Sequence, residues 1–430
     1  MIGYAFEHRF DNNIQFRQNF RYTDVKNDLQ STRPEGMDPA NPTQLVARSY
    51  NYVKSESQNV ALDNQLQADF RTGILTHKVL VGADYLHQTG NSDYRTQGST
   101  IFGGAFPSIN AYTPIYGAPI PSFDSLGSFI KSDAKLDQVG LYAQDQIKLD
   151  RWTLSLTGRQ DFVNSELNSQ AFYPPAGTYR RSDSAQTGRV GLNYLFDFGL
   201  APYINYSTSF VPNTGAGLDL KPFKPTTGDG KEIGVKYQPL GMNLMVTAAL
   251  FEINQNDVLT ANPINPFLSI QTDAARSRGF ELEVRGNLTR EMEIIAGFTT
   301  IDPTVTKSLL PAKVGKYLQG VPLDQASLWA KYTWFDGALA GFGLGAGIRY
   351  VGNSYGDDLN TFVLPAYTLF DATVSYDLAY WRTDLRGWKA QINATNLFDT
   401  YYTVSCLTGL PYCGLGTSRT VLGTLKYSWN

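Results

Sequence analysis

The chain has 430 residues, more than one compact soluble domain usually contains, so several domains or one very large sheet are needed. Aromatic residues make up 13% of the chain and charged residues only 17%, which is below the roughly 25% charged fraction of soluble domains. The net charge of −3 provides no basic field for phosphate neutralisation, which excludes nucleic acid as a partner.

No stretch approaches the roughly 20 apolar residues of a membrane-spanning helix. The mean hydropathy of −0.26 is typical of a soluble protein, but the strands of a membrane barrel hide an apolar face inside an alternating pattern. The first residues, 1–7, contain neither a basic nor an apolar signal region, so we expect no signal peptide there. A mature exported chain and a truncated chain would both begin in this way.

Alternation of apolar and polar residues is the dominant pattern along the chain. It is clear in 190–196 and 202–210, and it returns in 280–285, where three acidic or basic residues separate three apolar ones. Many of these segments have about ten residues or more, the length that a tilted strand needs to cross a bilayer. Aromatic residues gather near the ends of the segments, as in interfacial girdles: Trp152, Tyr237, Tyr332, Trp334, Tyr376 and Trp429.

We therefore predict an all-β, antiparallel transmembrane β-barrel in which the whole chain, 1–430, forms one unit. The predicted strands, in chain order, are 2–10, 14–24, 47–71, 77–90, 136–149, 152–163, 186–196, 202–211, 230–238, 243–255, 273–287, 290–301, 324–335, 341–353, 365–378, 387–397 and 418–429.

The predicted connections alternate in length, as they do in outer-membrane barrels. Short turns are expected at 11–13, 149–151, 197–199, 239–241, 287–289 and 335–337. Long loops are expected at about 25–46, 90–135, 164–185, 212–228, 256–272, 303–322, 354–364 and 398–418. A soluble sandwich has no reason to sort its connections onto two rims. The strand count of about 17 is odd, whereas a closed barrel needs an even number, so we expect a chain cut within a barrel.

Several segments together resemble TonB-dependent outer-membrane ferric-siderophore receptors, in particular the ferrichrome-receptor branch. The resemblance covers the whole chain and is carried by residues 2–8 with 17–19, 142–146, 231–237, 276–283, 326–329, 350–357 and 396–399, and by the final loop from Ser405 to Val421. Residues 34–37 and Leu407 depart from the aromatic pattern of ferrichrome receptors. The implied ligand is accordingly a related ferric hydroxamate.

This resemblance implies a barrel of 22 strands around an N-terminal plug. About 17 of those strands would be present here, and the plug, the TonB box and the first strands would be absent. It also implies an outer-membrane location, a ferric siderophore as ligand, and energy from the TonB-ExbB-ExbD complex through the plug. Iron would arrive as the siderophore complex, so no cofactor bound by protein ligands is expected. The alternatives are a plugless passive pore, a soluble β-repeat adhesin and a non-functional fragment.

Candidate ligand contacts lie in the expected loop 90–135, whose Gly, Pro and Ser content argues against regular structure. Aromatic side chains give a compact, apolar ferric complex a large contact area with a polar tip, and long loops often carry binding. The candidates are Tyr94, Phe102, Phe106, Tyr112 and Tyr116. The alternative is that these residues anchor the loops to one another.

No enzyme motif is present, and we expect neither a catalytic residue nor a metal site. His8, His77 and His87 have no metal-ligand spacing, and each is expected at the lumen or a rim. Glu281, Glu283 and Arg285 should face the lumen, where they would form cross-strand pairs or set ion selectivity. Cys406 and Cys413 form a close pair in an exported loop, which favours a disulfide over free thiols or a metal pair.

Overall fold

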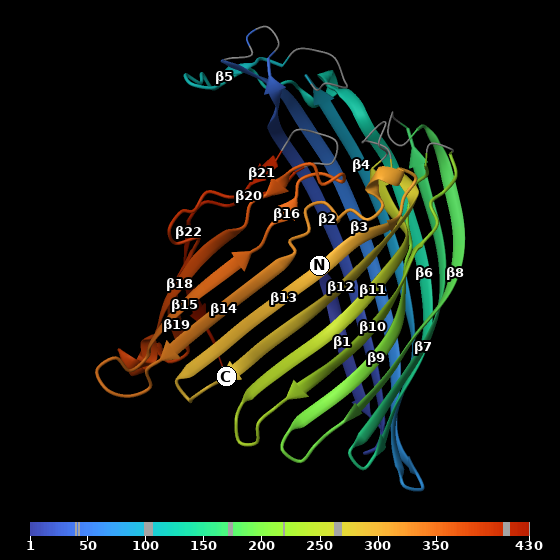
Figure 1. Ribbon diagram of the computed structural model, residues 1–430, viewed down its shortest axis with the longest axis vertical. Helices are drawn as coiled ribbons and strands as arrows, with labels where there is room; N and C mark the ends of the chain where they lie inside the picture. Colours follow the sequence, from blue (N-terminus) through green and yellow to red (C-terminus); the bar gives the residue numbers. More distant parts are fainter. Residues whose placement is uncertain are drawn as a thin grey trace.

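The protein is one strongly curved and tilted antiparallel sheet, shown by a computed structural model (Figure 1). The structure describes residues 1–38, 41, 44–98, 106–170, 175–217, 220–261, 269–406 and 413–429. Within these residues, the sheet has 18 strands. They are β1 (Ile2–Arg9), β2 (Ile14–Met37), β3 (Leu45–Thr72), β4 (Leu75–Gln97), β5 (Ile109–Asn110), β6 (Gly127–Leu149), β7 (Trp152–Ser169), β8 (Gly177–Tyr194), β9 (Leu200–Val211), β10 (Thr226–Tyr237), β11 (Leu244–Ala261), β12 (Ser269–Asn287), β13 (Met292–Lys307), β14 (Asp324–Thr333), β15 (Phe342–Val351), β18 (Tyr367–Asp377), β19 (Trp388–Thr395) and β22 (Thr420–Tyr427).

Small elements in the loops complete the described structure. Two short hairpins pair β16 (Ser354–Tyr355) with β17 (Val363–Leu364), and β20 (Thr403–Cys406) with β21 (Cys413–Leu415). The 3-10 helices are η1 (Phe123–Ser125), η2 (Pro311–Lys313), η3 (Leu378–Tyr380) and η4 (Thr383–Leu385).

No helix in the described part of the chain is both long enough and apolar enough to cross a membrane.

Each long strand pairs with its neighbour in the chain, so the sheet is an antiparallel meander. The two-residue β5 is an addition to β3, and every predicted strand range overlaps one of the other strands. Among the described pairings, β1 pairs only with β2 and β22 only with β19. The sheet is therefore open in this structure, with β1 and β22 at its edges.

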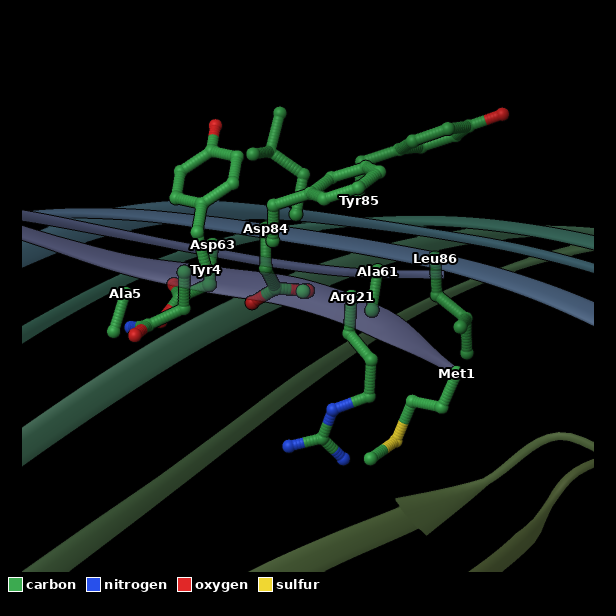
Figure 2. A pocket seen from close by; sticks show the side chains of 13 residues that line it. Met1, Tyr4, Ala5, Arg21, Ala61, Asp63, Asp84, Tyr85 and Leu86 are labelled. Atoms are coloured by element: carbon green, nitrogen blue, oxygen red, sulfur yellow. The ribbon is translucent and has the colours of Figure 1, made fainter. Parts of the chain in front are cut away.

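The two faces of the sheet differ in polarity because neighbouring residues of a strand point to opposite sides. One cross-strand row joins Tyr4, Phe20, Leu62, Tyr85 and Val139. We call the side that carries this row the outward face and the opposite side the inward face. Figure 2 shows Tyr4 and Tyr85 projecting to one side of the ribbon, while Arg21 and Asp84 point to the other.

The apolar row of the outward face continues around the sheet as a belt. On successive strands it includes Phe162, Val190, Ile204, Ile233, Leu250, Phe280, Phe298, Leu328, Ile348, Phe370 and Ile392. In the described part of the chain these side chains pack against no second layer; Leu250, for example, is 58% exposed. An uncovered belt of this kind is suited to lipid.

Charged and polar side chains cross between strands on the inward face. Arg159 of β7 donates hydrogen bonds to Asp84 on β4 and to Asp161 on its own strand. Its guanidinium passes over Gly140, where a Cβ atom would lie 1.9 Å from Nη2. In the same way, Tyr142 passes over Gly82 to donate to Asp63. Each bulky side chain thus occupies the space that a glycine leaves on the strand between.

Aromatic pairs line the rim that carries the short turns. Trp152 packs against Tyr194, and Tyr332 against Trp334, with ring centroids 4.8 Å apart in both pairs. At the end of the chain, Trp388 packs against Tyr427, which in turn contacts Trp429. The prediction that aromatic residues gather near strand ends is confirmed for these residues. Such a girdle is typical of a membrane–water interface.

Several strands extend beyond the predicted limits. β2 continues to Met37 and β4 to Gln97, so segments predicted as loops at 25–46 and 90–135 are partly regular strand. The 164–185 and 256–272 predictions fail in the same way. Polar composition was misleading because these ends lie beyond the belt, where both faces of a strand are polar. Figure 1 shows β2, β3 and β4 rising above the rest of the sheet.

A charge placed in the belt should destabilise the fold. We expect Leu250→Arg to lower the free energy of unfolding in phospholipid vesicles by about 2–4 kcal/mol, since an Arg near the bilayer midplane is poorly solvated. Urea unfolding followed by tryptophan fluorescence measures the change. Thr299→Lys is the matched control, because Thr299 faces inward and pairs with Glu281. Equal losses in the two variants would contradict the assignment of faces.

The upper end of β4 should respond to acid through Asp93. Burial raises the pKa of this carboxyl, but hydrogen bonds from Arg95 and Ser128 outweigh burial and hold the pKa below its ordinary value. The folded state therefore binds fewer protons at Asp93 than the unfolded state. The resulting stabilisation is complete above the unfolded pKa of about 3.9 and is lost as pH falls through the folded pKa.

We expect Asp93→Asn to lower the urea midpoint more at about pH 7 than at about pH 2, because acid protonates the carboxylate and removes the charge that the substitution would remove. Urea titrations of both proteins at the two pH values measure this. A loss of the same size at both values would mean that the side chain acts through packing rather than charge.

Candidate functional site

The long-loop rim holds the candidate site, which we call the mouth: the inward face at the upper ends of the strands, with the loops above it. At the mouth, the Tyr94 hydroxyl donates to Asn51 Oδ1 at 2.8 Å and accepts from Arg33 Nη2 at 3.2 Å. The three residues come from β4, β3 and β2. Burial raises the pKa of the Tyr94 phenol, an effect that Arg33 opposes, so the phenol is protonated at neutral pH.

Buried polar groups continue this network. Ser49 donates to Glu35 at 2.5 Å, and Thr96 donates to Asn51 Oδ1 at 2.9 Å. The side chain of Arg33 is 42% exposed, whereas that of Glu35 is 6% exposed. The mouth therefore presents a guanidinium next to a tyrosine ring on a rigid three-strand base. This combination is suited to a ligand with an apolar surface and oxygen acceptors.

The structure separates the predicted ligand residues. Phe106 is buried against Tyr50, with ring centroids 5.7 Å apart, and Tyr50 points to the outward face. Tyr112 and Tyr116 are each 78% exposed on the loop that follows β5. Phe102 lies outside the described residues, as does Leu407. Of these aromatic candidates, the described structure therefore places Tyr94 at the mouth and Phe106 on the other side of the sheet.

The connection between β9 and β10 folds over the inward face. Ala216 packs with Leu167 and Tyr179, which belong to β7 and β8. Phe223 is buried beside this cluster, near Gly215. Gln271 of β12 holds the end of the connection, because its amide donates to the carbonyl oxygens of both Lys224 and Asp257. This segment narrows the mouth from the side of β7 and β8.

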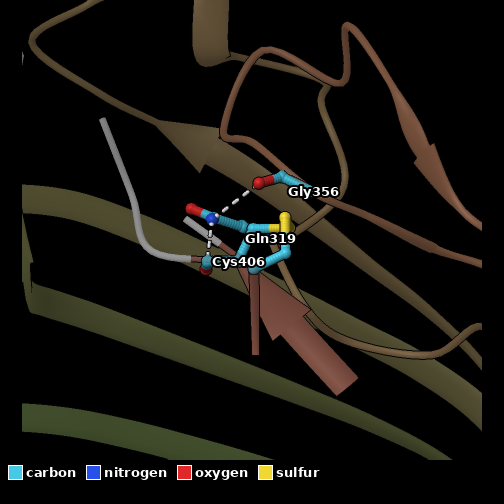
Figure 3. The surroundings of a disulfide bond; sticks show 4 residues. Gln319, Gly356 and Cys406 are labelled. Carbon is cyan, nitrogen blue, oxygen red and sulfur yellow. Dashed lines mark hydrogen bonds between the residues drawn. A yellow bond between two sulfur atoms is a disulfide. The ribbon is translucent and has the colours of Figure 1, made fainter. Parts of the chain in front are cut away.

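Three loops on the other side of the mouth form one unit, which we call the disulfide unit. It combines residues 308–323, 352–366 and 397–418 insofar as these are described. The amide of Gln319 donates to the carbonyl oxygens of Gly356 at 2.8 Å and Cys406 at 2.9 Å (Figure 3). Cys406 is joined to Cys413 by a disulfide. One side chain thus bridges all three loops.

Further contacts fix the disulfide unit. The buried ammonium of Lys313 lies 2.6 Å from Asp358 Oδ2. The rings of Tyr317 and Tyr355 stack with centroids 5.4 Å apart. Because both ends of each contact lie in different loops, the loops cannot move independently without breaking them. The unit is a preformed structure at the long-loop rim, and it contains one stacked aromatic pair.

A hollow of about 670 Å³ lies beside β1. Its lining combines Tyr4 and Tyr85 of the outward face with Arg21 and Asp84 of the inward face (Figure 2). It is therefore a feature of the edge of the sheet, and we assign it no binding role.

Sequence reasoning missed Arg33, Gln319 and the Tyr317–Tyr355 pair. Arg33 falls in a segment that was predicted as a loop, and its neighbours are set by strand register. The aromatic criterion that selected Tyr94 would also have selected Tyr317 and Tyr355 had it been applied to every long loop. Gln319 carried no signal, because a bridging amide depends on contacts between distant segments.

The three histidines lie on the outward face, so the lumen alternative is wrong for them. His8 and His77 lie near the short-turn rim, whereas His87 lies in the middle of β4. His8 shares its face with Phe6, and His77 stacks on Phe70. His87 and Asp137 are hydrogen-bonded on the same face, 2.7 Å apart. The inward positions predicted for Glu281, Glu283 and Arg285 are confirmed, because these residues alternate with the belt residues Phe280 and Leu282.

Comparison with known proteins identifies the fold. Residues 1–397 match the family model described as TonB dependent receptor-like, beta-barrel. The chain belongs to this family. Its members are outer-membrane transport receptors, so this chain is an outer-membrane β-barrel protein.

Two relatives match the whole chain or nearly so. The ferrioxamine B receptor of Salmonella typhimurium strain SL1344 is 38% identical over 430 residues, covering 100% of this chain and 58% of the relative. The ferrichrome outer membrane transporter/phage receptor of Escherichia coli strain K12 is 34% identical, covering 99% of this chain and 58% of the relative. The chain thus spans somewhat more than half the length of these receptors.

Solved receptors share the fold. The siderophore receptor PiuA of Acinetobacter baumannii superposes with a TM-score of 0.81 at 23% identity, covering 98% of this chain and 63% of that one. The closed form of the ferric-catecholate import receptor Fiu of E. coli K12 gives a TM-score of 0.80 at 23% identity, with the same coverage. These likenesses establish the architecture of the receptor wall.

Gln319 should hold the disulfide unit together. We expect Gln319→Ala to increase amide hydrogen exchange in 354–364 and 403–406 by about tenfold, since two hydrogen bonds to carbonyl oxygens are lost. Hydrogen-exchange mass spectrometry in detergent measures this. Gln325→Ala, on β14 below the unit, is the control. Unchanged exchange in both segments would show that the other contacts fix the loops without Gln319.

Proposed function

We propose that this chain forms the wall and the ligand-binding mouth of an outer-membrane receptor that imports a ferric siderophore of the hydroxamate type. The observation that carries the proposal is the similarity along the whole chain to receptors named for ferrioxamine B and ferrichrome, at 38% and 34% identity. Both of these ligands are ferric hydroxamates. Relatives named for a catecholate or for PiuA are 28% identical.

The chemistry of the mouth is consistent with such a ligand. A ferric trihydroxamate is compact, with an apolar exterior and carbonyl and hydroxamate oxygens that accept hydrogen bonds. Tyr94 offers ring area, and the partly exposed guanidinium of Arg33 offers N–H donors. Iron would enter as the preformed complex, with the siderophore rather than the protein supplying its ligands. Tyr112 and Tyr116 are proposed as further contacts from the exposed loop after β5.

Transport would involve no covalent chemistry. Binding at the mouth would be followed by rearrangement of a plug, driven by the TonB-ExbB-ExbD complex. This part of the proposal rests on the family and concerns a complete receptor. The chain spans 58% of the length of the matched ferrioxamine B receptor.

Ligand binding tests the proposal. We expect ferrioxamine B or ferrichrome to quench the tryptophan fluorescence of the detergent-solubilised chain with a Kd at least about tenfold below that of a ferric tricatecholate. Tyr94→Ala should raise the hydroxamate Kd by about tenfold or more, because ring contact area is lost. Tyr94→Phe, which keeps the ring, should raise it less. Equal affinities for the two siderophore classes would overturn the hydroxamate assignment.

A further inference from the structure

Three side chains at the short-turn ends of β3, β4 and β6 form a hydrogen-bonded row on the outward face, which we call the Thr–His–Asp cluster. Nδ1 of His77 lies 2.8 Å from Oδ2 of Asp145, and Nε2 of the same ring lies 2.7 Å from the hydroxyl oxygen of Thr72. An ionised carboxylate only accepts hydrogen bonds, so Nδ1 carries the ring proton and donates to Asp145. Nε2 is then left to accept from the Thr72 hydroxyl.

The order of these groups is that of a hydroxyl activated for acyl transfer. In such an arrangement the carboxylate holds the imidazole in one tautomer, and the free ring nitrogen takes the hydroxyl proton as the oxygen attacks. The three residues are 5 and 68 positions apart, so they form no sequence motif. The register of β4 with β3 and β6 brings them together.

The cluster is rigid at the imidazole and open at the hydroxyl. The side chain of His77 is only 12% exposed, and its ring stacks on Phe70 with centroids 5.0 Å apart. Thr72 is exposed at the end of β3. A molecule at the rim can therefore reach the hydroxyl without displacing the base.

Asp145 has no evident structural reason to lie where it does. On the outward face of β6 it lies between Ala143 and Ile147, and it pairs with Val79 of β4. Its Oδ1 atom is buried and has no hydrogen-bond partner in the described part of the chain. A carboxylate in such apolar surroundings is costly, which points to a functional rather than a stabilising role.

The turn next to the hydroxyl offers a backbone donor. Thr72 pairs with Leu75, and Gly73 and Ile74 form the two-residue turn between them. Gly73 has a φ of 61°, and no atom lies within 4 Å of the position that a Cβ would take. Among the described residues, neither turn N–H donates to a backbone carbonyl. The N–H directly after an attacking hydroxyl is a common donor to the oxyanion of an acyl-transfer intermediate.

The position of the cluster indicates the class of substrate. Thr76 pairs with Lys148, and the next residue, Leu149, pairs with Trp152 of the aromatic girdle. The cluster therefore lies at the membrane–water interface on the short-turn side, where the ester groups of glycerophospholipids are found. Ile147, which pairs with His77, continues the apolar outward face on which acyl chains would lie.

We propose that the Thr–His–Asp cluster hydrolyses a carboxylic ester of a glycerophospholipid at this interface. Thr72 Oγ1 attacks the ester carbonyl carbon while its proton passes to His77 Nε2, and the Gly73 N–H donates to the oxyanion. The bond from the carbonyl carbon to the glycerol oxygen then breaks, and His77 returns the proton to that oxygen. Water attacks the acyl-threonine with His77 as base, which releases the fatty acid and restores the hydroxyl. The activity is separate from siderophore import, because the cluster lies on the opposite face from the mouth.

Ester hydrolysis tests the proposal. Release of fatty acid from phosphatidylethanolamine in mixed micelles would be measured with the detergent-solubilised chain, and p-nitrophenyl butyrate would serve as a water-soluble ester. We expect Thr72→Val, which keeps the side-chain shape without the hydroxyl, to lower kcat about 100-fold or more. Thr72→Ser should retain kcat within about tenfold, since it keeps an attacking oxygen. His87→Ala is the matched control, because His87 bonds Asp137 on the same face, and it should leave the rate unchanged.

A fluorophosphonate probe identifies the attacking atom independently. We expect a covalent adduct on Thr72 of the wild-type chain, located by peptide mass spectrometry. His77→Gln should slow its formation about tenfold or more, because the base is lost while a donor toward Asp145 is kept. Heat-modifiable migration on gels shows whether each variant is folded.

Two results would overturn the proposal. One is hydrolysis by the wild-type chain no faster than by folded Thr72→Val, with no adduct on Thr72; the cluster would then only hold the β3–β4 hairpin together. The other is hydrolysis of p-nitrophenyl butyrate without hydrolysis of phosphatidylethanolamine, which would exclude the lipid ester as substrate.

Discussion

The constraint behind the whole structure is that hydrocarbon cannot satisfy a backbone hydrogen bond. Each N–H and C=O group at membrane depth must find a protein partner, and an unpaired group costs several kcal/mol. An antiparallel meander meets this condition from strand to strand, and long uninterrupted registers such as β3 with β4 show it. Because the backbone is committed to pairing, the side chains alone determine what each face contacts.

Because successive side chains of a strand point to opposite sides, the sheet has an apolar outward face and a polar inward face. Beyond the hydrocarbon, the same strands continue but the reason for an apolar outward face ends. There the extensions of β2, β3 and β4 carry polar groups on both sides: the Arg33–Tyr94–Asn51 network inward, and Glu56 with Lys26 and Asn91 outward. The same strands thus present one set of polar side chains to the mouth and another to the outside.

The sequence predicts those features that depend on local periodicity. Strand positions, the sorting of short and long connections and the girdle around Trp152 and Tyr332 follow from alternation and turn residues, and the structure agrees with them. The prediction missed the upper ends of the strands, because a strand with both faces in water has the polar composition of a loop. The candidate site was predicted least well. Whether Phe106 faces the mouth or the outside depends on how a long loop folds back, and no local pattern encodes that.

Two glycines of the inward face, Gly82 and Gly140, limit how the sequence of the sheet can change during evolution. Gly82 leaves room for Tyr142, and Gly140 leaves room for Arg159, across neighbouring strands. A larger residue at either glycine would collide with a side chain that already holds a cross-strand hydrogen bond. The two partners of each pair are therefore not free to diverge separately. Substitution at one is viable only together with a smaller residue at the other, so these positions should be inherited as linked pairs.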